Sequence, residues 1–244
     1  MSEFYQSIAK HYDDIFPLSD ALRDFLFSFG IFNEDRILDI GCATGEVALY
    51  LAQYAHSVTG IDLDPSLIEI AHSKKEERGI SNVRFLVGDM NDIDGVFTKN
   101  QFRIVVCLGN TLVHLLSTDI INDIFQKASN VLSDGGLFIF QILNYEKILA
   151  QKTIELPLID NNKITFERRY DHETHKPLLV FSTSLTVKTS SETINNSITL
   201  YPLQQKELMK MPSNHLFRSI RFLGGFDRRV FSKEDDLLIG VWQK

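Results

Sequence analysis

The stretch Leu38–Gly45, LDIGCATG, decides the fold that we expect for this chain. An apolar run ends there at an aspartate, and a glycine-rich turn follows directly before the helical pattern of residues 45–55, GEVALYLAQYA. Glycine permits a sharp turn and a close approach to a ligand because it has no Cβ. A helix that begins at such a turn also offers unpaired backbone N–H groups. We therefore expect a ligand-binding turn between a strand and a helix.

Strands and helices alternate on either side of this turn. Short apolar segments predict strands over residues 36–40, 57–63, 83–89, 102–109 and 135–143. Amphipathic segments predict helices over residues 45–55, 65–79 and 118–132, and further helices within residues 1–30. Two last strands are predicted over residues 219–231 and 236–244. This order is typical of an α/β protein. We predict a Rossmann-like, seven-stranded, mostly parallel sheet with helices on both faces.

The pattern changes after about residue 144. Residues 163–171, 177–190 and 192–203 read as three consecutive strands rich in threonine and β-branched side chains. A short helix is expected over residues 203–211. We predict a core domain formed by residues 1–150 and 203–244, with residues 151–202 as an antiparallel β insert. Its position after the fifth strand indicates a lid on the acceptor side of the site.

The composition excludes some classes of protein and disfavours others. The 244 residues carry a formal net charge of −7, whereas a nucleic-acid binder usually shows a basic face. No apolar stretch approaches ~18 residues, so no membrane span is expected. The polar, acidic start does not resemble a signal peptide. Both cysteines lie in apolar segments, which favours a reducing cytoplasm over a disulfide framework. Nothing in the sequence indicates the oligomeric state.

The turn itself is a poor phosphate site. A dinucleotide fingerprint needs three glycines, but Ala43 and Glu46 occupy the second and third positions, and an acidic side chain in the first helical turn repels pyrophosphate. Asp62 ends the second strand, where a carboxylate can bind both ribose hydroxyls. Asp89 ends the third strand and can accept from an adenine amino group, while the Met90 N–H can donate to a ring nitrogen. These residues indicate an adenosine-shaped site without a phosphate clamp.

Five segments carry a resemblance to a known family. They are ILDIGCATGEVALYLA, VTGIDLDPSLIEIA, VRFLVGDM, FRIVVCLGNTLVHL and VLSDGGLFIF, and together they resemble the class I S-adenosylmethionine-dependent methyltransferases. The resemblance implies S-adenosyl-L-methionine as the cofactor and no metal. The cofactor-binding residues that it implies are Tyr5, Tyr12, Asp39, Gly41, Cys42, Ala43, Gly45, Asp62, Leu63, Asp89, Met90, Leu108 and Asn110. Most relatives have glycine at position 43, and we expect alanine there to be a mild change.

The acceptor side is less well defined. GNTLVHL and QILNYEKIL look like the glycine and sarcosine N-methyltransferase branch, which implies a small-molecule acceptor and no nucleic-acid or membrane partner. His114 is the candidate base, and Asn144 and Tyr145 are candidate acceptor contacts. Asp171–His175, DHETH, is expected to be a solvated turn rather than a metal cluster. Three alternatives stay open: a protein that binds the cofactor without methylating, an NAD-dependent oxidoreductase, and an RNA or protein methyltransferase.

Overall fold

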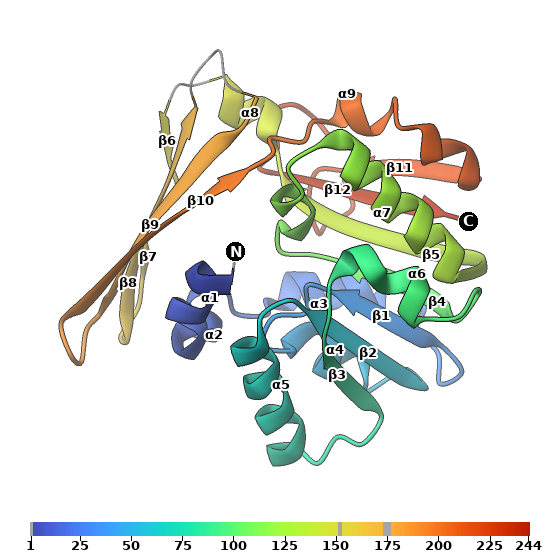
Figure 1. Cartoon of the computed structure of the whole chain (residues 1–244), viewed down its shortest axis with the longest axis horizontal. Helices are drawn as coiled ribbons and strands as arrows, with labels where there is room; N and C mark the ends of the chain where they lie inside the picture. Colours follow the sequence, from blue (N-terminus) through green and yellow to red (C-terminus); the bar gives the residue numbers. More distant parts are fainter. Residues whose placement is uncertain (1, 151–152, 173–176) are drawn as a thin grey trace.

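A seven-stranded sheet forms the centre of the molecule (Figure 1). The computed structural model describes residues 2–150, 153–172 and 177–244. The strand order is β11-β12-β5-β4-β1-β2-β3. The strands are β1 (Arg36–Ile40), β2 (Ser57–Asp62), β3 (Val83–Val87), β4 (Phe102–Cys107), β5 (Leu132–Leu143), β11 (Ser219–Leu223) and β12 (Leu237–Gln243). The first five are parallel, and β12 runs antiparallel to both of its neighbours. The predicted Rossmann-like fold is confirmed.

Helices cover both faces of this sheet. They include α3 (Asp20–Phe27), α4 (Glu46–Leu51), α5 (Pro65–Glu77), α6 (Ile93–Val96), α7 (Thr118–Val131), α8 (Tyr145–Leu149) and α9 (Gln205–Leu208). On one face, α7 buries Ile121 and Phe125 against Phe138 of β5. On the other face, Phe25 of α3 and Leu49 of α4 pack with Ile37 of β1. These two apolar layers hold the strand ends, and therefore the turns that follow them, in fixed positions.

A second, antiparallel sheet follows α8 and has the order β10-β9-β8-β6. Its strands are β6 (Thr153–Glu155), β8 (Ile164–His172), β9 (Leu179–Val187) and β10 (Glu192–Leu200), and β7 (Ile159–Asp160) also pairs with β8. The sequence predicted three strands in this insert, and the described residues form five. Strands β6 and β7 are too short to show an alternating pattern, and they form by pairing with the free edge of β8.

Two other predicted segments are shorter than expected. The helix predicted over residues 203–211 is regular only over Gln205–Leu208, after which Pro212 begins the 3₁₀ turn η4 (Pro212–Leu216). The strand predicted over residues 219–231 ends at Leu223 because Gly224 and Gly225 open a long loop. Both differences arise at proline or glycine, which interrupt regular hydrogen bonding.

The N-terminal segment lies between the two sheets (Figure 1). It comprises α1 (Ser2–Ile8), the 3₁₀ turn η1 (Ala9–His11) and α2 (Tyr12–Ile15). Phe4 packs against Phe181 of β9 with ring centroids 6.0 Å apart, and Phe16 packs edge-on against Phe166 of β8. Asn161 donates from its side chain to the Asp14 carbonyl at 3.0 Å. The N-terminal helices are therefore held against the second sheet by apolar and polar contacts.

Candidate active site

The turn after β1 is held tightly against β2. The backbone N–H groups of Gly41 and Cys42 both donate to the Ile61 carbonyl, at 2.8 and 3.0 Å. Gly41 has φ +70°, and a Cβ there would lie 2.5 Å from the side chain of Thr111. Gly45 has φ +82°, and a Cβ there would lie 2.5 Å from Phe85. Both positions require glycine. Gly45 permits the close approach of the turn to Phe85 of β3 and Ala71 of α5, whereas Gly41 lies at the cavity wall.

Ala43 is strained in a way that the sequence did not show. Its φ is +47°, in the left-handed region, which costs an L-residue roughly 1–2 kcal/mol relative to the right-handed one. Its N–H donates to Asp62 Oδ2 at 2.9 Å, and its side chain packs with Leu67 and Ala9. We expected alanine to be mild because it adds one methyl group. The methyl group fits between its neighbours, and the unfavourable free energy comes instead from the left-handed backbone conformation of Ala43.

Two carboxylates line the same cavity from the ends of β2 and β3. Asp62 accepts from the Ala43 N–H and, through Oδ1, from the Asp64 N–H at 3.0 Å. Burial raises the pKa of Asp62, and these backbone hydrogen bonds oppose the rise. Asp89 accepts two hydrogen bonds from Asn91 at Oδ1, both 2.8 Å long, which leaves Oδ2 for a ligand. The cavity thus carries hydrogen-bond acceptors at both positions that the sequence predicted.

Aromatic side chains from the N-terminal helices close this cavity. Tyr5, Tyr12 and His114 line it together with Leu63 and Met90, and its volume is about 100 Å³. The Tyr5 hydroxyl lies 2.8 Å from His114 Nε2, and His114 Nδ1 is buried without a partner among the described residues. Burial lowers the pKa of His114 to about 4, so its ring is neutral at pH 7. Burial also raises the pKa of Tyr5, whose phenol stays protonated.

A second, adjoining cavity of about 340 Å³ lies on the other side of the turn. It shares Tyr12, Gly41 and Ala43 with the first cavity. Its other walls include Asp39, Cys42, Leu108, Gln141 and Arg168. Asp39 is 2 % exposed, and its Oδ2 has no partner within the described chain. Burial, and secondarily the charge of Asp62, raise the pKa of Asp39 to about 7.

Two predicted site residues, Asn110 and Tyr145, have side chains that bind to each other. Asn110 donates to the Tyr145 hydroxyl at 2.9 Å and accepts from the Leu143 N–H at 3.0 Å. Tyr145 is 1 % exposed, and its ring lies edge-on against Tyr170. These contacts fix the loop after β4 to the end of β5. Asn110 and Tyr145 therefore line neither of the two cavities and instead hold the loop after β4 in place.

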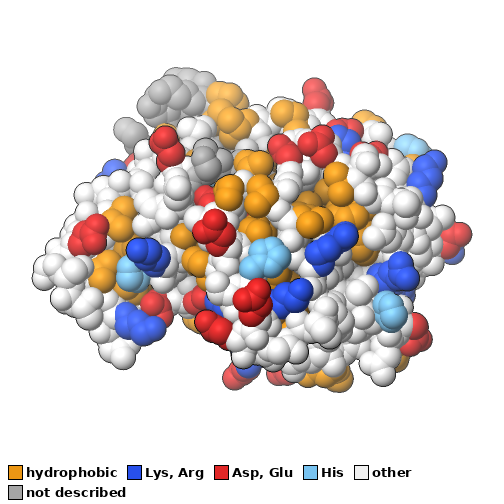
Figure 2. Space-filling view, turned by 60° about the horizontal axis from the view of Figure 1, so that its bottom comes forward, with side chains coloured by type: hydrophobic (Ala, Val, Ile, Leu, Met, Phe, Trp, Pro, Cys, Tyr) orange, Lys and Arg blue, Asp and Glu red, His pale blue; other side chains and the backbone are white. Residues whose placement is uncertain are grey.

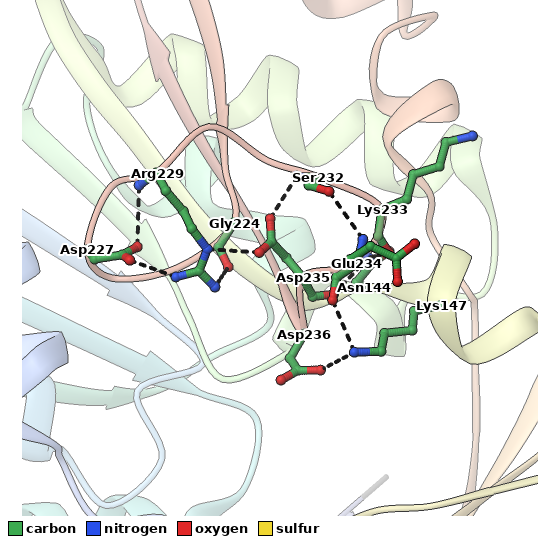
Figure 3. Close-up of polar contacts among 10 residues, drawn as sticks. All are labelled: Asn144, Lys147, Gly224, Asp227, Arg229, Ser232, Lys233, Glu234, Asp235 and Asp236. Carbon is green, nitrogen blue, oxygen red and sulfur yellow. Dashed lines mark hydrogen bonds and ion pairs between the residues drawn. The ribbon is translucent and has the colours of Figure 1, made fainter.

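Asn144 belongs to a polar network of the C-terminal loop (Figure 3). Its Nδ2 donates to the carbonyls of Lys233 and Asp235, at 2.8 and 2.9 Å, and its Oδ1 caps α8 by accepting from the Glu146 N–H. Next to it, Lys147 bonds to Asp236 at 2.7 Å. This geometry does not support the predicted acceptor contact at Asn144, because its Nδ2 holds the C-terminal loop and its Oδ1 caps α8.

Sequence reasoning missed three polar residues at these cavities. Gln141 accepts from the Gly109 N–H at 2.9 Å through its side chain, and Thr111 donates to the Leu108 carbonyl at 2.7 Å. Both hold the loop after β4 in place. Arg168 comes from β8 of the second sheet. The only signal for Gln141 and Arg168 was a polar residue within an apolar strand pattern. Of the predicted turn Asp171–His175, residues 173–175 lie outside the described residues.

Comparison with known proteins agrees with this geometry. Residues 37–136 match the model of a methyltransferase domain. A putative methyltransferase of Geobacillus sp. (strain WCH70) is 31% identical over 144 residues, which are 57% of each chain. A 2-heptyl-1-hydroxyquinolin-4(1H)-one methyltransferase of Mycobacteroides abscessus is 30% identical over 50% of this chain and 51% of its own. The chain thus matches little more than half the length of these relatives.

Solved structures match over nearly the whole chain. An S-adenosylmethionine-dependent methyltransferase from Clostridium acetobutylicum has a TM-score of 0.80 at 17% identity and covers 98% of both chains. The CcbJ methyltransferase from Streptomyces caelestis has a TM-score of 0.79 at 22% identity and covers 96% of this chain and 95% of its own. Residues 37–136 thus match a methyltransferase domain, and the chain as a whole has the fold of these S-adenosylmethionine-dependent methyltransferases. The second sheet lies within these alignments and is therefore a shared part of the fold.

The residues present fit S-adenosyl-L-methionine, the cofactor that the sequence resemblance implies. Asp62 and Asp89 offer oxygens to ribose and adenine, and the unpaired Asp39 oxygen lies across the Gly41 turn from them. The negative charge at these positions suits a cationic ligand. Glu46, which counts against a pyrophosphate, pairs with Lys74 and Arg78 of the α5 end. In the described part of the chain, no helix has the length and apolar character to cross a membrane.

Proposed function

We propose that this chain is an S-adenosyl-L-methionine-dependent methyltransferase that transfers a methyl group to a small-molecule acceptor by in-line displacement. The observation that carries the proposal is the pair of adjoining cavities on either side of the Gly41 turn, with Asp62 and Asp89 on one side and Asp39 on the other. S-adenosyl-L-methionine supplies an electrophilic methyl group on a positively charged sulfur. The protein's part is to hold the two reactants in line and close together, which can supply on the order of 7–11 kcal/mol.

The chain's own residues would act mainly by position and by excluding water. Tyr5 and Tyr12 cover the first cavity, and Leu67 and Leu115 line it, so that competing water is kept out. His114 is our candidate for the group that takes a proton from the acceptor. Its ring is neutral at pH 7, and Tyr5 fixes its orientation through Nε2. A neutral imidazole is the form that can accept a proton.

The surface supports a small acceptor over a nucleic acid. On the face drawn in Figure 2, acidic and basic side chains are interspersed with hydrophobic ones, and the described side chains of this face form no continuous basic area. The net charge is −7. Some relatives have names that state an RNA substrate, among them a ribosomal RNA large subunit methyltransferase E of Brachyspira hyodysenteriae, 26% identical over 74% of this chain. An RNA acceptor is therefore the second candidate and belongs in the assay.

We further propose that residues 151–202 form part of a cover over the acceptor, since β8 and β9 contact the N-terminal helices.

A cytoplasmic location is supported by two buried, free cysteines.

The test is release of S-adenosylhomocysteine from S-adenosyl-L-methionine in the presence of a panel of small amines, hydroxylated compounds, quinolones and total RNA. Turnover with a small molecule and none with RNA is expected. Turnover with RNA alone would replace the proposed acceptor class. Calorimetric binding of S-adenosylhomocysteine without turnover on any substrate would favour a binding protein, and binding of NAD instead would favour an oxidoreductase.

A further inference from the structure

Strand β10 forms a free edge of the second sheet. It pairs with β9 over nine consecutive residues without a bulge, and no other described strand pairs with it. Its inner face is already in use, because Asn196 donates to the Ser7 hydroxyl of α1 at 2.7 Å and Ile198 packs against the core. The backbone of residues 193–199 makes no backbone hydrogen bond to any described residue outside β9. Alternate N–H and C=O groups of an antiparallel strand point away from its neighbour, so the outer edge of β10 carries unpaired ones.

The other sheet edges in the described chain are short, and those of the main sheet are also charged. Strands β3 and β11 at the two edges of the main sheet have five residues each and carry the exposed arginines Arg84 and Arg221. Strands β6 and β7, which pair with the far edge of β8, have three and two residues. Short length and exposed charge are common means by which proteins keep an edge from pairing with another chain. Strand β10 has nine residues, no proline and no basic residue, and its single charged residue is Glu192 at the hairpin end.

The sequence of β10 is nearly symmetric about its central residue, Asn196. Residues 193–199 read TINNSIT, which makes three pairs of positions equivalent: Thr193 with Thr199, Ile194 with Ile198, and Asn195 with Ser197. When two copies of such a strand pair in antiparallel fashion about a two-fold axis at Asn196, each residue lies opposite its equivalent in the other copy. A surface that matches itself in this way is what a symmetric dimer requires. The symmetry becomes informative only because the fold places this segment at an edge.

We propose that β10 pairs with β10 of a second copy of this chain, antiparallel and centred on Asn196, so that the two second sheets join into one continuous sheet. Opposed residues of an antiparallel pair share a face, so the half-buried Ile194 of each copy meets Ile198 of the other on the inner face. The two-fold axis closes the contact, which gives a dimer and not a fibre. The β9–β10 hairpin extends away from the main sheet, which leaves room for a second copy beside it (Figure 1).

Like charges at the pairing positions test this contact. Sedimentation velocity over a range of protein concentrations measures the association of the wild type, which we expect to be a dimer that dissociates on dilution. In Asn195→Lys with Ser197→Lys, each copy places two lysines opposite two lysines of the other. Like charges directly opposite destabilise a strand pair, so the dissociation constant should rise roughly tenfold or more. Both side chains are exposed, so the melting temperature of the monomer should change little.

The matched control carries the same charges one strand further in. Ser182 and Ser184 of β9 are the cross-strand neighbours of Ser197 and Asn195 on the same face. Ser182→Lys with Ser184→Lys should therefore dimerise as the wild type does, because these positions do not lie at the edge.

A charge exchange tests the register. In Asn195→Lys with Ser197→Glu, each lysine lies opposite a glutamate of the other copy only when position 195 faces position 197, and this variant should dimerise at least as tightly as the wild type. A wild type that stays monomeric up to about 1 mM overturns the proposal. So does a dimer that the double-lysine variant leaves unchanged, or a lysine–glutamate variant as weak as the double-lysine one. None of these measurements uses a cofactor or an acceptor, so their outcome is independent of the proposed function.

Discussion

Replacing Asp62 with alanine tests the centre of the site, because this carboxylate has two tasks. Inside the protein it accepts from the N–H groups of Ala43 and Asp64, at 2.9 and 3.0 Å. A hydrogen bond to a charged group contributes about 1.5–3 kcal/mol. Burial raises the pKa of Asp62, so the unfavourable desolvation of the charge offsets part of this gain. We expect Asp62→Ala to lower the free energy of unfolding by about 2 kcal/mol.

The effect on the cofactor adds to this loss of stability. In the proposed complex the ribose hydroxyls donate to the Asp62 carboxylate, and Asp62→Ala removes this interaction. Its loss costs about 1.5–3 kcal/mol of binding free energy, which lowers the affinity for S-adenosylhomocysteine by roughly 10- to 100-fold. Calorimetry with S-adenosylhomocysteine measures it at a temperature well below the melting point of the variant. Asp62→Asn keeps one acceptor oxygen for the Ala43 N–H, so it should retain more stability than alanine.

A control separates stability from binding. Asn82→Ala removes two side-chain hydrogen bonds, from Asn82 Nδ2 to the carbonyls of Ala52 and Ala55 at 2.7 and 3.0 Å, and none of these three residues lines either cavity. It should destabilise the protein by about 1–3 kcal/mol and leave S-adenosylhomocysteine affinity unchanged. If Asp62→Ala binds S-adenosylhomocysteine as tightly as this control does, Asp62 does not bind the ribose.

Three further replacements test other parts of the site. Burial raises the pKa of Asp39 to about 7, so the folded protein loses stability as the pH rises from about 4 to 7 and this carboxyl ionises. Asp39→Asn removes the buried charge and should therefore raise the melting temperature more at pH 8 than at pH 5. An equal rise at both pH values would contradict the raised pKa. Asn144→Ala should lower the free energy of unfolding in urea by about 2–3 kcal/mol through two hydrogen bonds and a helix cap, with unchanged S-adenosylhomocysteine affinity. Gly41→Ala should destabilise by at least about 1–2 kcal/mol, and Thr111→Ala in the same chain should recover part of the loss; no recovery would mean that the backbone φ alone is responsible.

The fold of the core followed from periodicity because nearly every strand is bounded by a clear turn signal. The strands β1 to β5 fell within one or two residues of the predicted segments, except at the start of β5, which extends back to Leu132 through Gly135 and Gly136. The second sheet was predicted in kind but not in strand number. Strands of two or three residues form because they pair with the edge of a neighbouring strand, here β8. Their own side chains are too few to show an alternating pattern, so the sequence of the segment alone does not predict them.

The structure places Asp62 and Asp89, at which an acidic residue coincides with a strand end, in the wall of one cavity, so their predicted cofactor contacts stay predictions. Asn144 also follows a strand, but it lines neither cavity. A polar residue after a parallel strand can face the ligand or cap the next helix, and both roles favour the same residue types. Asn144 caps the next helix through its Oδ1. Its Nδ2 donates to the carbonyls of Lys233 and Asp235, which are 89 and 91 positions away in the sequence. Contacts over such separations cannot be read from the local sequence.

Two of the three missed residues show what a break in an apolar pattern does and does not indicate. Gln141 interrupts the apolar run of β5, and Arg168 interrupts the inward row of β8. A buried polar group must find a partner, so each break signals an interaction before the structure is known. The partner of Gln141 is the Gly109 N–H, inside the protein. Arg168 Nε has none within the described chain, although this atom is shielded from solvent. The sequence can thus mark both positions, but only the fold distinguishes the residue whose partner lies inside the protein from the one that has no partner among the described residues.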